Sequence, residues 1–172
     1  PTRIRLDFDS ELESLEAEIE LRVGEFFYAR GTFLAEEISQ TVQVVSSTGT
    51  TETPTATIQT YAVTNAVVFA GSFDGTSPYN SDGTLQESAV GFTLTGTDFV
   101  FVKVSENDGT RTWKAIKARA QSAEIAGFDG FTLSANTVVV KSNAAATDNS
   151  FIDFSTDPLG TDSLPIKYDS QL

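Results

Sequence analysis

The chain has 172 residues, no His, no Cys and no Met, and a formal net charge of −13 at pH 7. His is the usual general base and metal ligand, and Cys is the strongest nucleophile. Their absence removes the common routes to catalysis, and we expect no enzyme activity. The negative charge argues against nucleic acid and anionic membrane surfaces as partners, because both require a Lys/Arg patch.

The composition nevertheless fits a folded domain. Hydrophobic residues make up 40% of the chain and include 13 Phe, which is ample for a single core at this length. No apolar run approaches the roughly 20 residues that span a bilayer, so we expect no membrane insertion. The lack of Cys fits a reducing compartment or a very long bacterial surface protein. The missing initiator Met indicates a processed product or a segment of a longer chain.

The first part of the chain predicts three strands. Residues 4–8 alternate apolar and polar side chains, as a half-buried strand does. A capping-box pattern at residues 10–13 and an apolar stripe of Leu12, Leu15 and Ile19 support a helix. Residues 15–23, in contrast, fit a strand. Five strictly alternating apolar residues in that same segment outweigh the three helical matches, so we predict a long strand. Gly24 then predicts a bend, and residues 26–34 a second strand.

The middle of the chain alternates loops with apolar runs. Residues 46–57 are polar and predict a loop or hairpin tip. Residues 66–70 are continuously apolar and predict a strand covered on both faces. Residues 72–87 contain two Asp-Gly pairs and a Pro, which is the strongest loop signal in the chain. Residues 90–104 predict a pair of strands broken near Gly96.

The last part predicts one more hairpin and several short strands. Residues 106–109 read Glu-Asn-Asp-Gly, a hairpin turn, because Asn, Asp and Gly tolerate positive φ. The return strand covers residues 112–123. Shorter strands are predicted at residues 131–133, 138–141 and 151–154. The tail, residues 157–172, contains two Pro, which predicts a linker.

Together these patterns predict an all-β, elongated antiparallel architecture, either a β-sandwich or a stacked-sheet rod. Residues 1–156 form a single β domain or repeat unit, and residues 157–172 form a linker or inter-unit connector. Residues 91–99 and 130–138 echo one another in their spacing of Gly, Phe and Leu. The echo is either chance in a Thr- and Phe-rich chain or a repeated strand–turn–strand unit.

Several segments resemble the repeats of giant bacterial surface proteins, the adhesin-like tandem-repeat family. Residues 23–33 (VGEFFYARGTF) are similar to the opening of such a repeat, and residues 90–99 (VGFTLTGTDF) to its middle strand. Residues 125–135 are likewise similar to the middle strand, and residues 151–154 resemble the segment that closes the unit. The resemblance implies a tandem, secreted, cell-surface or filament-forming protein and supplies no catalytic residues. The polar inserts at residues 46–57 and 72–87 depart from the family pattern.

Acidic residues in loops raise the possibility of a Ca²⁺ site. Ca²⁺ takes six to eight oxygen ligands, which carboxylates and carbonyls can supply. Asp74 and Asp82 lie in the long Gly-rich loop and are the best candidates. The alternative is that these and the other Asp residues (Asp7, Asp9, Asp148 and Asp153) are turn formers and solvated charges.

The same loop could contact carbohydrate. Tyr79 can stack on a sugar face while Asn80 bonds to hydroxyl groups. The alternative is that Tyr79 packs the loop onto the body of the domain.

We therefore expect a structural repeat module of an extracellular bacterial filament or giant adhesin that acts by self-association with copies of itself or neighbouring repeats. The alternative is a surface adhesion module that binds glycans or Ca²⁺. Self-association would proceed by strand pairing at unprotected sheet edges or by docking of the chain ends onto neighbours. The residues expected in that docking are Ile4, Leu6, Phe8, Ile166 and Tyr168.

Overall fold

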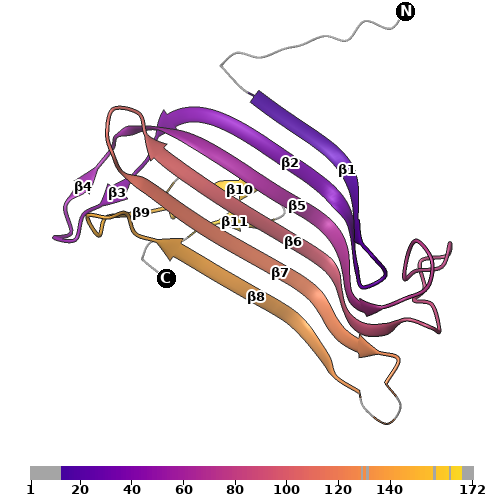
Figure 1. Cartoon of the computed structure of the whole chain (residues 1–172). Coiled ribbons are helices and arrows are strands. Elements are labelled where there is room, and N and C mark those ends of the chain that lie inside the picture. Colours follow the sequence, from indigo (N-terminus) through magenta and orange to yellow (C-terminus); the bar gives the residue numbers. More distant parts are fainter. Residues whose placement is uncertain (1–12, 129, 131, 157, 163, 168–172) are drawn as a thin grey trace, which may run out of the picture.

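The computed structural model describes residues 13–128, 130, 132–156, 158–162 and 164–167, and these residues contain no helix. Their main element is a six-stranded sheet in which every neighbouring pair is antiparallel. The strands follow one another across the sheet as an up-and-down meander (Figure 1). They are β1 (Glu13–Val23), β2 (Phe27–Thr41), β5 (Thr55–Ser72), β6 (Val90–Glu106), β7 (Thr112–Ala126) and β8 (Ser134–Ala144). The prediction of an all-β antiparallel fold is confirmed.

Two small sheets cover one face of the large sheet. The first has the order β4-β3-β9, and the second is the hairpin β10-β11. Figure 1 shows β10 and β11 behind the large sheet, and they contact β5, β6 and β7. The small strands are β3 (Val44–Val45), β4 (Thr51–Glu52), β9 (Phe151–Ile152), β10 (Leu159–Thr161) and β11 (Leu164–Ile166). Two layers of sheet around one core are the arrangement of a β-sandwich.

The inner face of the large sheet, the side that carries Ile58, Val102 and Trp113, holds the main hydrophobic core. Alternate residues of β5, β6 and β7 point to this face because successive side chains of a strand point to opposite sides. Trp113 is 1% exposed, and its indole N–H donates to the carbonyl oxygen of Ser150 at 3.1 Å. The small sheets complete the core with Val44, Ile152, Leu159, Leu164 and Ile166.

A second apolar cluster closes the other end of the inner face. Phe69 and Phe73 meet edge to face with ring centroids 5.7 Å apart. Tyr79 packs against Tyr28, also on the inner face, with centroids 5.9 Å apart. The segment between β5 and β6 therefore folds back over the sheet, as its strong loop signal permits.

A line of irregular residues crosses the large sheet. Asn65 in β5, Gly96 in β6 and Thr137 in β8 have positive φ angles of 50°, 54° and 60°. The β5–β6 register shifts between Val63 and Ala66 at the same level. Such bulges bend a strand and increase its twist, and the strands curve along their length in Figure 1. The predicted break near Gly96 is thus a bulge inside one continuous strand, and the expectation of two strands was wrong.

An ion pair stabilises this bend on the inner face. Asp98 is 6% exposed and accepts a hydrogen bond from Arg119 Nη2 at 2.7 Å. Its other carboxylate oxygen accepts the backbone N–H of Asn65 at 2.9 Å. The carboxylate therefore joins three neighbouring strands where their regular ladder is interrupted.

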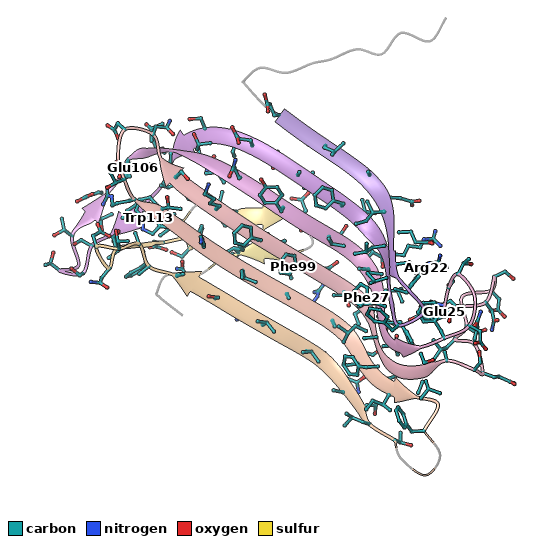
Figure 2. All side chains as sticks on the ribbon, in the orientation of Figure 1. Arg22, Glu25, Phe27, Phe99, Glu106 and Trp113 are labelled. Carbon is teal, nitrogen blue, oxygen red and sulfur yellow. The ribbon has the colours of Figure 1, made fainter. Side chains whose placement is uncertain are left out.

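Other strand predictions can be compared directly with the structure. The long strand over residues 15–23 is confirmed as β1, and the turn over residues 106–109 joins β6 to β7. The second strand is longer than expected and continues to Thr41. Residues 66–70 are not covered on both faces: Phe69 is buried but Ala70 is exposed. The reason is that no described element packs on the open face, the side that carries Phe99 (Figure 2) and the cross-strand pair of Tyr61 and Phe101.

The tail expected to be a linker contributes to the core. Within residues 157–172, β10 and β11 form a hairpin, and Leu164 and Ile166 are 2% and 0% exposed. Pro165 lies inside this hairpin, and Lys117 of β7 donates to its carbonyl oxygen at 2.6 Å. The Pro and Gly residues that indicated a linker instead shape a tight hairpin.

Arg111 ties one small sheet to the large one. Its guanidinium donates to Glu106 at the end of β6 at 2.6 Å and lies 3.0 Å from Glu52 of β4. It also stacks 5.3 Å from the centre of the Trp113 ring. The hydrogen bonds from Arg111 hold the pKa of Glu106 below its ordinary value. The pair therefore stabilises the fold in the pH range where Glu106 is ionised.

The burial of β11 predicts that Ile166→Ala lowers the free energy of unfolding by about 2–5 kcal/mol. The loss combines the transfer free energy of the removed methyl groups with the cavity they leave. Urea unfolding followed by the fluorescence of the single Trp measures it. Leu133→Ala is the control, because Leu133 is 48% exposed and should change stability by less than about 0.5 kcal/mol. Equal effects of the two substitutions would mean that the tail is a linker after all.

The Glu106–Arg111 pair predicts a pH-dependent effect of Glu106→Gln. At pH 7 the substitution should lower the free energy of unfolding by about 1–3 kcal/mol, because a charge-assisted hydrogen bond is lost. The folded-state pKa of Glu106 is depressed, so its contribution is complete above the unfolded-state pKa and disappears as pH falls through the folded value. The difference in the free energy of unfolding between wild type and variant is measured by urea unfolding at pH 7 and pH 3. It should be smaller at pH 3 than at pH 7. Asp108→Asn, in the exposed turn, is the control. A difference that is the same at both pH values would contradict the assignment.

Candidate functional site

Asn80 and Asp82 in the 73–89 loop help to form a tight turn. Asp82 Oδ1 accepts from the backbone N–H of Thr84 at 2.9 Å and from its hydroxyl at 2.6 Å. These hydrogen bonds lower the pKa of Asp82. Asn80 also bonds to Thr84 through both its backbone and its side chain. Asp82 and Asn80 are therefore engaged in closing the turn.

The structure gives no support to the expected Ca²⁺ site. Asp74 is exposed at a bend eight residues before Asp82. Within the described part of the chain, no group of three or more acidic residues could hold a metal ion. Ca²⁺ binding at Asp74 and Asp82 stays a prediction.

Tyr79 is held against the sheet. Its hydroxyl hydrogen-bonds to the hydroxyl of Thr93 in β6 at 2.7 Å, and its ring packs on Tyr28. Burial raises the pKa of the Tyr79 phenol. These contacts favour the packing role for Tyr79 over stacking on a sugar.

The docking residues expected at the chain ends fall into two groups. Ile4, Leu6, Phe8 and Tyr168 lie outside the described residues. Ile166 is fully buried in the core of its own chain. It cannot dock onto a neighbour unless β10 and β11 leave the core, so the expectation for Ile166 was wrong.

The two edges of the large sheet are the exposed backbone surfaces that sequence reasoning did not locate. β1 and β8 end the strand order, and neither has a second strand partner among the described residues. Each strand has 11 residues. β1 contains four Glu and one Arg, whereas β8 contains Lys141 and no acidic residue. The Glu residues that recur between positions 13 and 20 were the sequence signal for the β1 edge, because charged side chains on a strand are typical of a sheet edge.

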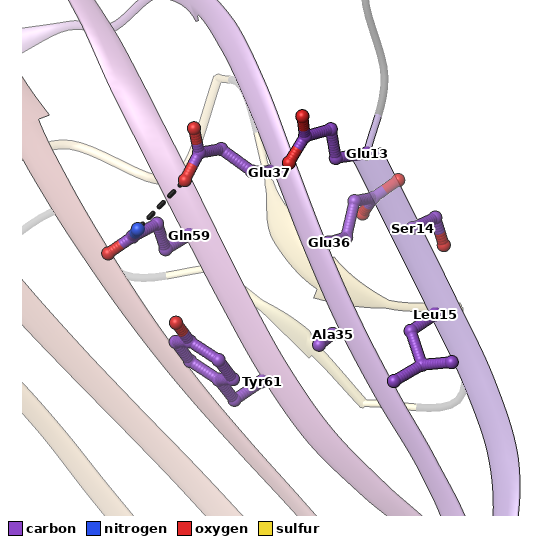
Figure 3. A pocket seen from close by; sticks show the side chains of 8 residues that line it. All are labelled: Glu13, Ser14, Leu15, Ala35, Glu36, Glu37, Gln59 and Tyr61. Carbon is purple, nitrogen blue, oxygen red and sulfur yellow. Dashed lines mark hydrogen bonds between the residues drawn. The ribbon is translucent and has the colours of Figure 1, made fainter.

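Opposite charges also lie at opposite sides of the open face. Glu13, Glu37, Gln59, Lys103 and Lys114 occupy one cross-strand row, from β1 through β2, β5 and β6 to β7. The Gln59 amide donates to Glu37 at 2.8 Å and accepts from Lys103 at 3.5 Å. Figure 3 shows the acidic side of this row, with Glu13, Glu37 and Gln59 around a shallow hollow whose lower part is formed by Leu15, Ala35 and Tyr61.

Cations gather on the inner face beside β8. Lys117, Arg119 and Lys141 line a hollow together with Leu164 and Pro165. Burial, and then the nearby cations, lower the pKa of Lys117. The inner face therefore carries positive charge at the β7–β8 side, while Glu16, Glu18 and Glu20 place negative charge at the β1 side.

No protein-family model, curated protein or solved structure matches the chain. In the described residues, no helix is long and apolar enough to cross a membrane.

The Tyr79–Thr93 contact predicts a coupling that a double-mutant cycle measures. Tyr79→Phe and Thr93→Val each remove one hydroxyl, and the hydrogen bond between them should contribute about 1 kcal/mol to stability. The coupling energy is obtained from urea unfolding of the wild type, both single variants and the double variant. A coupling near zero would show that Tyr79 is not fixed to the sheet and would reopen a ligand-binding role.

Proposed function

We propose that the chain is a structural module of an extracellular bacterial filament or giant surface adhesin and acts by self-association. The observation that carries the proposal is the pair of open, oppositely charged strands at the two edges of one sheet. Open edges pair readily with other strands through backbone hydrogen bonds. The acidic composition without Cys and the repeat-like segments support an extracellular location.

The topology supports pairing between β1 of one copy and β8 of the next. The sheet is a meander with an even number of strands, so its first and last strands run in opposite directions. Two copies placed side by side in the same orientation therefore bring β1 and β8 together as an antiparallel pair. The equal length of the two strands leaves no unpaired overhang.

The charges favour this pair over the alternatives. Pairing β1 with another β1 would oppose Glu residues, which is destabilising, whereas β8 offers a Lys. In the present sheet one cross-strand row runs from Glu16 through Lys117 to Lys141. If this row continues from one copy into the next, Lys141 of the first copy lies beside Glu16 of the second. In the same register, Val140 of the first copy lies beside Ala17 of the second. The register thus matches opposite charges on the inner face and apolar residues on the open face.

Because each copy keeps one free β1 and one free β8, the contact is heterologous and propagates into a filament. Growth stops only when an edge is covered. This mode uses the sheet edges and does not require the chain ends.

Charge reversal at the proposed pair tests the function. Lys141→Glu and Glu16→Lys should each raise the concentration needed for assembly by about tenfold, because an attractive cross-strand pair becomes repulsive. The double variant Glu16→Lys/Lys141→Glu should restore assembly. Light scattering against concentration, with electron microscopy of the products, gives the readout.

Lys167→Glu is the matched control, since it makes the same change of charge near the same cations but outside both edge strands. A wild-type chain that stays monomeric would contradict the proposal. A monomer that gives a saturable signal with Ca²⁺ or a glycan panel would support the adhesion-module alternative instead.

A further inference from the structure

The open face of the large sheet is apolar over most of its width. The cross-strand row through Phe99 contains Ala17, Phe33, Val63, Ala118 and Val140 from the other five strands. The rows that start at Leu15, Leu21 and Val23 are apolar across five or six strands in the same way. Leu15 and Val140, at the two sides of this face, are 58% and 55% exposed.

The described residues leave this face uncovered. The small sheets pack on the inner face, and the 73–89 loop also folds over the inner face onto Phe69. In Figure 1 the hairpin of β10 and β11 lies behind the large sheet, and Phe99 lies on the near side in Figure 2. The apolar side chains of six strands therefore point away from the rest of the domain.

The extent of the apolar face matches a protein interface. With about 4.8 Å between strands and 3.4 Å per residue, six strands and eight residue steps cover on the order of 650 Å² of sheet. This footprint includes the line of irregular residues at Asn65, Gly96 and Thr137, so its apolar part lies within the range of about 300–600 Å² found for the largest apolar patch of a typical monomer. The whole footprint is close to the roughly 800 Å² that each partner contributes to a stable interface.

The charged row at one end of the face is complementary to itself. Negative charge lies on β1 and β2, and positive charge lies on β6 and β7. Two copies can be placed with their open faces in contact and related by a rotation of 180° about an axis that runs parallel to the strands, between β5 and β6. This rotation lays β2 of one copy over β7 of the other, and β5 of one copy over β6 of the other. It places Glu37 of one copy over Lys114 of the other, and Gln59 over Lys103.

The other face-to-face arrangements lack this match. A two-fold axis across the strands, at the level of the charged row, places Glu37 over Glu37. The same axis at the centre of the strands places the charged row over an apolar row, where its charges lose water without gaining partners. The axis along the strands is the one that pairs both the charges and the apolar rows.

We infer that the open face is the interface of a symmetric homodimer, in which two copies stack their large sheets with Glu37 against Lys114 of the second copy. The two sheets form an aligned sandwich with their apolar rows as a shared core, about 10 Å apart. The inference goes beyond the proposed filament contact, because it uses the face and leaves both edges free. Edge pairing of such dimers gives a ribbon two sheets thick.

The test uses the full chain carrying Lys141→Glu, below the concentration at which this variant assembles through its edges, so that edge assembly does not obscure the dimer. Sedimentation at micromolar concentrations should show a dimer. Adding Glu37→Lys should raise its dissociation constant about a hundredfold, because the two-fold axis repeats each altered pair and each contributes about tenfold. Adding Lys114→Glu to that variant should restore the dimer.

Glu18→Lys is the matched control. It makes the same change of charge on the inner face of the neighbouring strand β1 and should leave the dimer intact. The fluorescence of Trp113 checks that every variant is folded.

The outcomes separate this inference from the proposed function. If the wild type polymerises but Lys141→Glu is a monomer, the face does not self-associate and the inference is overturned while the filament contact stands. If wild type and Lys141→Glu are both dimers that Glu37→Lys dissociates, the inference stands and the edge contact fails. A dimer unaffected by Glu37→Lys overturns the proposed stacking.

Discussion

The structure depends on one constraint: a six-stranded sheet has two faces, and the rest of the described chain covers only one. The short strands β3, β9, β10 and β11 bury the inner face around Trp113. Burial of apolar surface is the main favourable term in folding, and here it concentrates on one side. The apolar residues of the opposite side remain in water in the isolated chain. This imbalance explains why the surfaces of interest are a face and two edges rather than a pocket.

Several polar contacts fix the geometry of that single sheet. Asp98 joins Arg119 to the backbone of Asn65 where the strands bulge. Arg111 joins the β6–β7 hairpin to β4 and covers Trp113. The hydroxyl of Tyr79 attaches the long loop to Thr93. Each contact ties segments that are distant in the chain, so the covered face is firmly held and the sheet presents a defined open face.

Charge distribution gives the exposed surfaces direction. An acidic β1 side and a basic β7–β8 side make the sheet polar across its strands, although the chain as a whole carries a charge of −13. The same polarity serves both proposed contacts. Side-by-side copies place the acidic edge against the basic edge, and stacked copies related by a two-fold axis place acid over base. Apolar area supplies the affinity of such contacts, and charge selects their register.

The sequence by itself determined the fold class, the long strand β1 and the turn after Glu106, because alternation and positive-φ residues are local signals. It also indicated two possible roles for Tyr79, stacking on a sugar or packing the loop onto the domain. The contacts of Tyr79 with Thr93 and Tyr28 favour packing. Only the tertiary structure decided that Gly96 makes a bulge, because the bulge aligns with Asn65 and Thr137 on other strands. It likewise placed Ile166 in the core instead of a linker, since burial of a short Pro-containing hairpin depends on the sheet beneath it. The row from Glu13 to Lys114 brings together residues up to 101 positions apart. Strand order and register create that row, and neither is encoded in any local stretch of sequence.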